Sequence, residues 1–217
     1  EYRRQRQMCI RDRLTDSLAG QDLLTGGTAV SLQTVKDPLQ TAENLLSGFA
    51  NAPDFGAKIK MAFGNSFNVA SADALAKAWV AGDFSSFPKI EIRNSTEING
   101  AKGAFAAANN TIYLSREFLS GNAANTEAVV SVLLEEIGHA VDTQLNDADT
   151  PGDEGEIFSA LVRGEKLEAE QLQRMKAEDD TATVTLDGEI VQIEQATVSD
   201  SGGFEGSTKT LKLESKG

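Results

Sequence analysis

The spacing of apolar residues predicts one long helix after the middle of the chain. Over residues 126–146 the apolar side chains recur at helical intervals on one face: Val130, Leu133, Leu134, Ile137, Val141 and Leu145. Thr126 is the expected N-cap of this helix. Shorter helices are expected where similar spacing recurs, over residues 38–49, 54–63, 71–81, 154–162 and 167–176. Ser71 is the expected N-cap of the helix that begins with it.

Elsewhere the apolar residues alternate with polar ones, which predicts strands. Residues 89–93 alternate strictly, and Asn109-Asn110 lies between two β-compatible runs, where it can form a hairpin turn because Asn tolerates positive φ. Asp187-Gly188 separates two more alternating runs and favours a tight hairpin. The chain is therefore expected to be α+β: a small twisted sheet of about three strands packed on the long central helix, with a C-terminal β-hairpin closing the domain.

The chain divides into four parts by composition. Residues 1–13 look like a translated sequencing adapter, with a native Arg-rich arm as the alternative. Residues 14–52 are expected to be a partly helical lead-in, and residues 53–196 the α+β domain. Residues 197–217 are interpreted as a Gly/Ser/Thr linker and the truncated start of a β module, because residues 208–214 alternate as a strand without a partner. Further domains of the same polypeptide are expected after residue 217.

Composition and charge limit the classes of partner that the protein is expected to bind. The 217 residues are 40% hydrophobic and 24% charged, as in an ordinary globular protein. The formal net charge of −13 argues against a nucleic-acid or anionic-membrane partner and favours cations. The single cysteine excludes a disulfide framework. No segment approaches the ~18 apolar residues that a membrane span needs.

The long helix carries the chemically distinctive residues. At about 100° per residue, Glu135, His139 and Asp142 share one stripe of the helix, and Glu136 lies one residue round from it. This is the layout of the H-E-x-x-H motif, in which residues at i and i+4 bind a metal ion and the intervening Glu takes a proton from metal-bound water. The spacing predicts Glu135 and His139 as ligands and Glu136 as the catalytic base.

A family resemblance extends this interpretation. The strand Thr111-Ile112-Tyr113-Leu114-Ser115, the helix with E-x-G-H-x-x-D and the next helix with E-x-x-S-A resemble zincin metallopeptidases of the glutamate-ligand type, including the lethal-factor C-terminal kind. The resemblance implies a zincin-like fold, Glu156 as third metal ligand, Glu136 as general base, and an edge strand that pairs with a peptide or protein substrate. Sequence from residue 65 onward also resembles a module of very large, multi-domain exported proteins of cyanobacteria, which implies a secreted or cell-surface location.

One departure from the family pattern affects the chemistry. The first ligand position holds Glu135, and His139 is the only histidine in the chain. Two carboxylates would neutralise a divalent ion, so bound water would be less acidified and hydrolysis would weaken. Zinc is the first expectation for the ion, and an oxygen-rich set also suits manganese or calcium. A working site requires donor atoms of Glu135, His139 and Glu156 within roughly 2.0–2.3 Å of one shared point.

Other interpretations of the same residues stay open. The stripe with Glu135, His139 and Asp142 can be a solvated helix face or a hydrogen-bonded polar cluster. The acidic loop that follows the helix can bind calcium, with Asp153 and Glu154 among its oxygen donors, but it is not an EF-hand because Phe158 occupies the position of the bidentate Glu. Two functions follow: a metallopeptidase-like domain with weakened or lost catalysis, or a non-catalytic structural or adhesive module that holds a His/Glu cluster or calcium.

Overall fold

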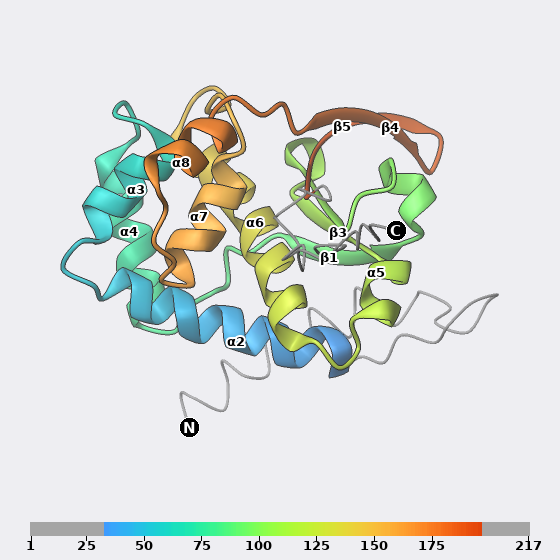
Figure 1. Ribbon diagram of the computed structural model, residues 1–217, viewed down its shortest axis with the longest axis horizontal. Coiled ribbons are helices and arrows are strands. Elements are labelled where there is room, and N and C mark those ends of the chain that lie inside the picture. The colour runs from blue at the N-terminus through green and yellow to red at the C-terminus, as the bar shows by residue number, and fades with distance from the viewer. Residues whose placement is uncertain (1–32, 197–217) are drawn as a thin grey trace, which may run out of the picture.

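The computed structural model describes residues 33–196 and has the expected α+β architecture. Its helices are α2 (Gln33–Ala50), α3 (Phe55–Phe63), α4 (Val69–Val80), α5 (Arg116–Gly121), α6 (Thr126–Leu145), α7 (Glu154–Val162) and α8 (Ala169–Met175). Its strands are β1 (Lys89–Arg93), β2 (Gly103–Ala106), β3 (Thr111–Ser115), β4 (Thr181–Leu186) and β5 (Glu189–Ala196). Figure 1 shows α6 between the sheet and a group of helices that includes α3, α4, α7 and α8.

All the strands belong to one five-stranded sheet in the order β1-β3-β2-β5-β4. The β1–β3 pair is parallel and the other pairs are antiparallel. Both predicted hairpin turns are confirmed: Asn110 has φ 49°, and Asp187 and Gly188 have φ 52° and 88°. The expected sheet of about three strands is too small. The C-terminal hairpin does not close the domain separately but extends the sheet, because β5 pairs with β2.

The predicted helices are present, with corrections at their ends. α6 begins with Asn125 rather than Thr126 as N-cap, because the Asn125 side chain accepts a hydrogen bond from the Ala128 N–H at 3.2 Å. Asn68 caps α4 in the place predicted for Ser71, whose N–H donates to the Asn68 side chain at 3.1 Å. The spacing of apolar residues does not predict α5, because this helix is too short for its period to be recognised.

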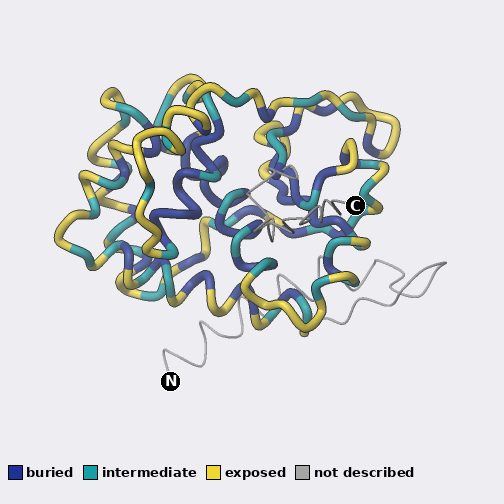
Figure 2. Tube along the Cα trace, in the orientation of Figure 1, coloured by how far each residue is buried: buried dark blue, intermediate teal, exposed yellow. Residues whose placement is uncertain are grey.

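The sheet is buried on both faces at its centre. Along β3, Ile112 and Leu114 belong to the main apolar cluster with α6, whereas Tyr113 belongs to a smaller cluster with Leu186 and Ile193 of the hairpin. Alternate residues of a strand point to opposite faces, so the two clusters lie on opposite sides of the sheet. Figure 2 shows the buried residues concentrated along α6, α7 and the central strands. α6 is therefore covered by α2 and α7 as well as by β2 and β5.

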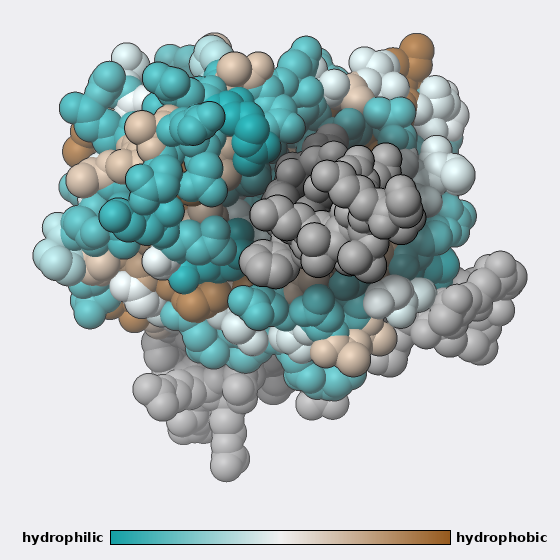
Figure 3. Space-filling model, viewed as in Figure 1, coloured by the Kyte–Doolittle hydropathy of each residue, from teal (hydrophilic) through white to brown (hydrophobic). Residues whose placement is uncertain are grey.

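The surface is mainly hydrophilic on the face seen in Figure 3. The large apolar side chains that are exposed come from α3, both ends of α4 and β5: Met61, Val69, Val80 and Ile190. Within residues 33–196, none of the helices combines the length and apolar character that crossing a bilayer would require. The expectations for residues 1–13 and 208–214 lie outside the described residues.

Glu43 gives a test of the helical core. It is buried on α2, where burial raises its pKa to about 7 despite a hydrogen bond from Gln40. The folded state therefore loses stability as the pH rises from about 4.5 to about 7, because the ionised form is disfavoured inside the protein. We expect Glu43→Gln to raise the free energy of unfolding by about 1–3 kcal/mol at pH 8 and by less at pH 5. Urea unfolding at both pH values measures this, with exposed Asp73→Asn as control, and an equal effect at both would contradict it.

Candidate metal centre

The backbones of α6 and α7 are in direct contact at Gly138 and Gly155, with no side chain between them. A Cβ atom added to Gly138 of α6 would lie 2.8 Å from the Cα of Gly155 in the first turn of α7. A Cβ atom added to Gly155 would lie 2.5 Å from Nε2 of His139. Both distances are shorter than any Cβ contact allows, so the two glycines are what lets the His139 ring lie directly against the beginning of α7.

His139 is fully buried and surrounded by carboxylates. Its Nδ1 lies 2.8 Å from Oε1 of Glu154 in the first turn of α7 and 2.9 Å from Oε2 of Glu194 in β5. On the other side of the ring, Nε2 lies 3.4 Å from Oδ2 of Asp180, the residue before β4. Among the described residues, neither Nε2 nor this Asp180 oxygen has a hydrogen-bond partner. The interpretation of this helix stripe as a solvated face is therefore wrong, because the His139 side chain is excluded from water.

Burial dominates the electrostatics of the surrounding acids. It raises the pKa of Glu154 to about 7 and that of Asp153 to about 6, although His139 opposes both shifts. Asp149 is an exposed residue of the acidic loop, and partial desolvation with the charge of Glu194 raises its pKa to about 6. Burial lowers the pKa of His139, but the negative charges beginning with Glu154 outweigh it and leave that pKa well above its usual value. The cluster thus contains more carboxyl groups than one imidazolium can balance, and burial favours their protonated forms.

The cluster fits a divalent metal ion. Within residues 33–196, four sets of side chains have donor atoms within 4.8 Å of one another: His139 with Glu154 and Glu194, His139 with Asp153 and Asp180, Asp142 with Asp149 and Glu154, and Asp153 with Glu156 and Glu178. One imidazole nitrogen among carboxylate oxygens is a donor set that zinc, manganese and similar ions accept. Buried carboxylates are stable only when paired, protonated or bound to a cation, so a cation here would relieve a real cost.

The residues predicted as ligands are divided among these sets. Asp153 and Glu154 both join His139. Glu156 groups instead with Asp153 and Glu178, and its Oε1 lies 3.6 Å from the guanidinium of Arg174. Glu135 belongs to none of the sets, although burial raises its pKa well above the usual value and the charge of Asp153 adds to the shift. The side chains of Glu135, His139 and Glu156 are therefore not brought together in these positions, and this ligand set stays a prediction.

Asp142 is buried at the end of α6 and orders the loop that follows. Its Oδ1 accepts hydrogen bonds of 2.6 Å from the Asn146 amide and from the Thr150 hydroxyl, and its Oδ2 accepts the Thr150 N–H at 3.0 Å. This bonding accounts for both oxygens of Asp142. Its visible role is to fix the acidic loop between α6 and α7 near Glu154.

Glu136, the predicted base, faces the sheet. Its Oε1 accepts the Ala196 N–H of β5 at 3.2 Å and would lie 2.7 Å from a Cβ atom added to Gly103 of β2. Its Oε2 is buried and has no hydrogen-bond partner among the described residues. Burial raises the pKa of Glu136 well above the usual value, and the charge of His139 opposes that shift. Glu136 is thus held between two strands and α6, near the cluster but on its sheet side.

The strand expected to pair with substrate is not an edge. β3, which carries the predicted motif Thr111–Ser115, lies between β1 and β2 and is paired with both. Its backbone hydrogen-bonding groups are used inside the sheet, so the implied pairing of this strand with a peptide is wrong. The edges of the sheet are β1 and β4.

Two residues of the cluster were missed from the sequence. Asp180 and Glu194 both lie outside the motif and the acidic loop from which the site residues are predicted. No local signal marks Glu194, because alternation along β5 places it on the face of the exposed Ile190 and Gln192, opposite the buried Val191 and Ile193. Glu194 meets His139 only because the end of β5 pairs with β2.

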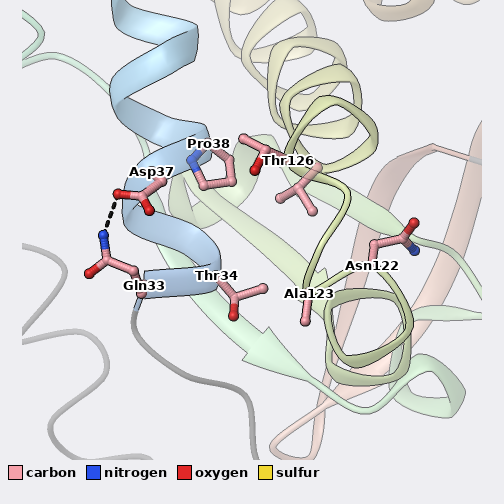
Figure 4. A pocket seen from close by; sticks show the side chains of 8 residues that line it. Gln33, Thr34, Asp37, Pro38, Asn122, Ala123 and Thr126 are labelled. Atoms are coloured by element: carbon pink, nitrogen blue, oxygen red, sulfur yellow. Dashed lines mark hydrogen bonds between the residues drawn. The ribbon is translucent and has the colours of Figure 1, made fainter.

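A separate hollow of about 270 Å³ lies between the start of α2 and the start of α6. It is lined by Gln33, Thr34, Asp37, Pro38, Asn122, Ala123, Thr126 and Val129. Figure 4 shows Asp37 hydrogen-bonded to Gln33 along α2, so its carboxylate already has a partner.

Comparison of the chain with protein-family models, with curated proteins and with solved structures found no match.

The glycine contact between α6 and α7 predicts a position-specific effect of alanine. Gly155→Ala forces the His139 ring or α7 to move, and we expect it to lower the free energy of unfolding by about 1–3 kcal/mol. Gly48→Ala in α2 meets nothing within 4 Å and is expected to be neutral or to stabilise by up to about 1 kcal/mol, because Ala favours helix more than Gly does. Urea unfolding compares the two variants. A Gly155→Ala protein as stable as Gly48→Ala would contradict the described contact.

Proposed function

We propose that this domain is a metallopeptidase-like module that binds a divalent metal ion at His139 and in which the ion has a structural role. The observation that carries the proposal is the complete burial of His139 among the carboxylates of Glu154, Glu194, Asp153 and Asp180. One imidazolium balances the charge of one of these four carboxylates, whereas a divalent ion balances two.

The kinds of donor atom around His139 favour a metal ion, rather than protons alone, as what compensates the buried carboxylates. His139 offers the nitrogen donor. The oxygen donors come from three separate parts of the chain, which are the start of α7, the residue before β4, and β5. Bringing buried carboxylates together raises the free energy of the folded state unless something binds them. Zinc and manganese both accept such a mixed set, and the excess of oxygen donors favours manganese more than in a two-histidine site.

Two features support a structural role over a hydrolytic one. Carboxylate ligands reduce the charge on the ion, so a bound water would stay protonated at a higher pH than in a site with more histidines. Glu136, the only candidate for a base in the motif, has one oxygen occupied by the Ala196 N–H of the sheet. A base must reach the proton that it takes, and this hydrogen bond holds Glu136 towards β5.

Metal-dependent cleavage of a peptide or protein substrate is the second candidate function. It is favoured by the buried Oε2 of Glu136, which has no hydrogen-bond partner within residues 33–196 and lies close enough to His139 for their charges to interact. It is also favoured by the resemblance of the motif around Glu136 to that of zincins.

Metal stoichiometry tests the proposal. The protein is dialysed separately against zinc, manganese and calcium, and bound metal is measured by mass spectrometry. We expect about one equivalent of zinc or manganese in the parent and in the surface variant Asp73→Asn, and its loss in His139→Ala, because that change removes the only nitrogen donor. Circular dichroism checks that the variant is folded. A parent that retains no metal, or a folded His139→Ala protein that retains it fully, would show the proposal to be wrong.

Turnover separates the two functions. We expect the metal-loaded parent to cleave unstructured protein substrate no faster than Glu136→Gln, because the ion is not used for hydrolysis. Cleavage followed by mass spectrometry, with rates compared at equal metal loading, measures this. A fall of about 100-fold or more in cleavage rate on Glu136→Gln would instead establish Glu136 as a general base and the domain as a peptidase.

A further inference from the structure

The two nitrogens of the His139 ring have different surroundings. Nδ1 makes the short contacts, at 2.8 Å to Glu154 and 2.9 Å to Glu194. A nitrogen so close to carboxylate oxygens carries its proton and donates it, here to Glu154. Metal-binding histidines commonly donate one ring N–H to a carboxylate, which fixes the ring and leaves the lone pair of the other nitrogen for the ion. Glu154 is in the position of such a carboxylate.

The set of His139, Asp153 and Asp180 has the properties of a metal site, and Asp180 lies on the Nε2 side of the ring. Its three residues are at least nine-tenths buried, with relative exposures of 0% for His139, 4% for Asp153 and 4% for Asp180. Their donor atoms lie within 4.8 Å of one another. Nε2 and Asp180 Oδ2 are 3.4 Å apart, and both lack a hydrogen-bond partner among the described residues. Ligands of a tetrahedral ion at about 2.0–2.1 Å stand roughly 3.3 Å from each other, so this separation suits two atoms that share an ion.

Asp153 completes the set without losing its local role. It is the N-cap of α7, where its Oδ1 accepts the Glu156 N–H at 2.6 Å, and one of its carboxylate oxygens lies within 4.8 Å of donor atoms of His139 and Asp180. Its backbone N–H donates to the Met175 carbonyl at 2.8 Å. The Asp180 carbonyl accepts the Gln195 N–H of β5 at 3.1 Å. Backbone hydrogen bonds therefore hold Asp153 next to the end of α8 and Asp180 next to β5.

We propose that the ion binds Nε2 of His139 together with Asp153 and Asp180, and that it fastens the β4–β5 hairpin to α6 and α7. This inference rests on the proposed function, since it assigns the ligands of the ion that the proposal invokes. It differs from the set expected from the motif, because Asp153 and Asp180 replace Glu135 and Glu156. The ion then joins α6, the beginning of α7 and the base of the hairpin, which are distant in the chain.

The competing arrangement contains no metal. In it His139 is an imidazolium that also donates from Nε2 to Asp180. The two arrangements differ at Nε2, which is metal-bound in one and protonated in the other. Because the chain has a single histidine, ¹⁵N NMR of the imidazole reports on His139 without assignment by mutation. We expect zinc to move the Nε2 resonance of the full chain while Nδ1 remains protonated, and an unchanged Nε2 in metal-loaded protein would overturn the inference.

A pair of adjacent variants tests the role of the hairpin. We expect Asp180→Asn to weaken zinc binding, measured by calorimetry on the full chain, by about 10-fold or more. Asp179→Asn is the matched control, because Asp179 is exposed and bonded to Thr181, and it should leave the affinity unchanged. Hydrogen exchange supplies a second measurement: zinc should slow exchange of amides in residues 181–196 of the parent and not of Asp180→Asn.

The outcomes separate this inference from the proposed function. Failure of the parent to bind metal contradicts both. Metal binding that survives Asp180→Asn but is lost in Glu135→Gln would place the ion on the motif-derived set and overturn only this inference. A zinc-induced change at Nδ1 instead of Nε2 would place the ion with Glu154 and Glu194 and would also overturn it, with metal binding itself retained.

Discussion

The burial of excess negative charge around His139 is the constraint on which the rest of the structure depends. Glu154 is contributed by α7, Glu194 by β5 and Asp180 by the residue before β4, and all meet one imidazole on α6. Carboxylates in such a place oppose folding unless a cation or protons compensate them. The helices and the hairpin therefore have to stay together around this charged group of residues. The stability of the fold is linked to the cation or protons that compensate the carboxylates.

The packing around the centre is consistent with this demand. The Gly138–Gly155 contact brings the first turn of α7 against α6, and a side chain at either glycine would separate them. Pairing of β5 with β2 brings Glu194 to His139 and places the Ala196 N–H where it donates to Glu136. The loop between α6 and α7 is fixed by Asp142. Each contact limits how far the acids can move apart, and together they hold the acidic side chains around His139.

Local patterns were sufficient to predict most elements and part of the site. Helical spacing located α6 and α7, and Asp187-Gly188 located the C-terminal hairpin, because these signals lie within short stretches of sequence. His139, Asp153 and Glu154 were recognised from the same stretch of α6 and the loop after it. Asp180 and Glu194 were not, because they reach His139 only through the β2–β5 pairing, which joins residues far apart in the chain. The interior position of β3 was missed for the same reason, since strand order is not encoded in any one strand.

The most direct test of a metal centre at His139 is an anomalous difference map from crystals of the full chain equilibrated with zinc and, in parallel, with manganese. The account predicts one peak at about 2.0–2.3 Å from Nε2 of His139, with carboxylate oxygens of Asp153 and Asp180 at similar distances. A map without a peak in the cluster, and with both nitrogens of His139 hydrogen-bonded to carboxylates, would contradict it.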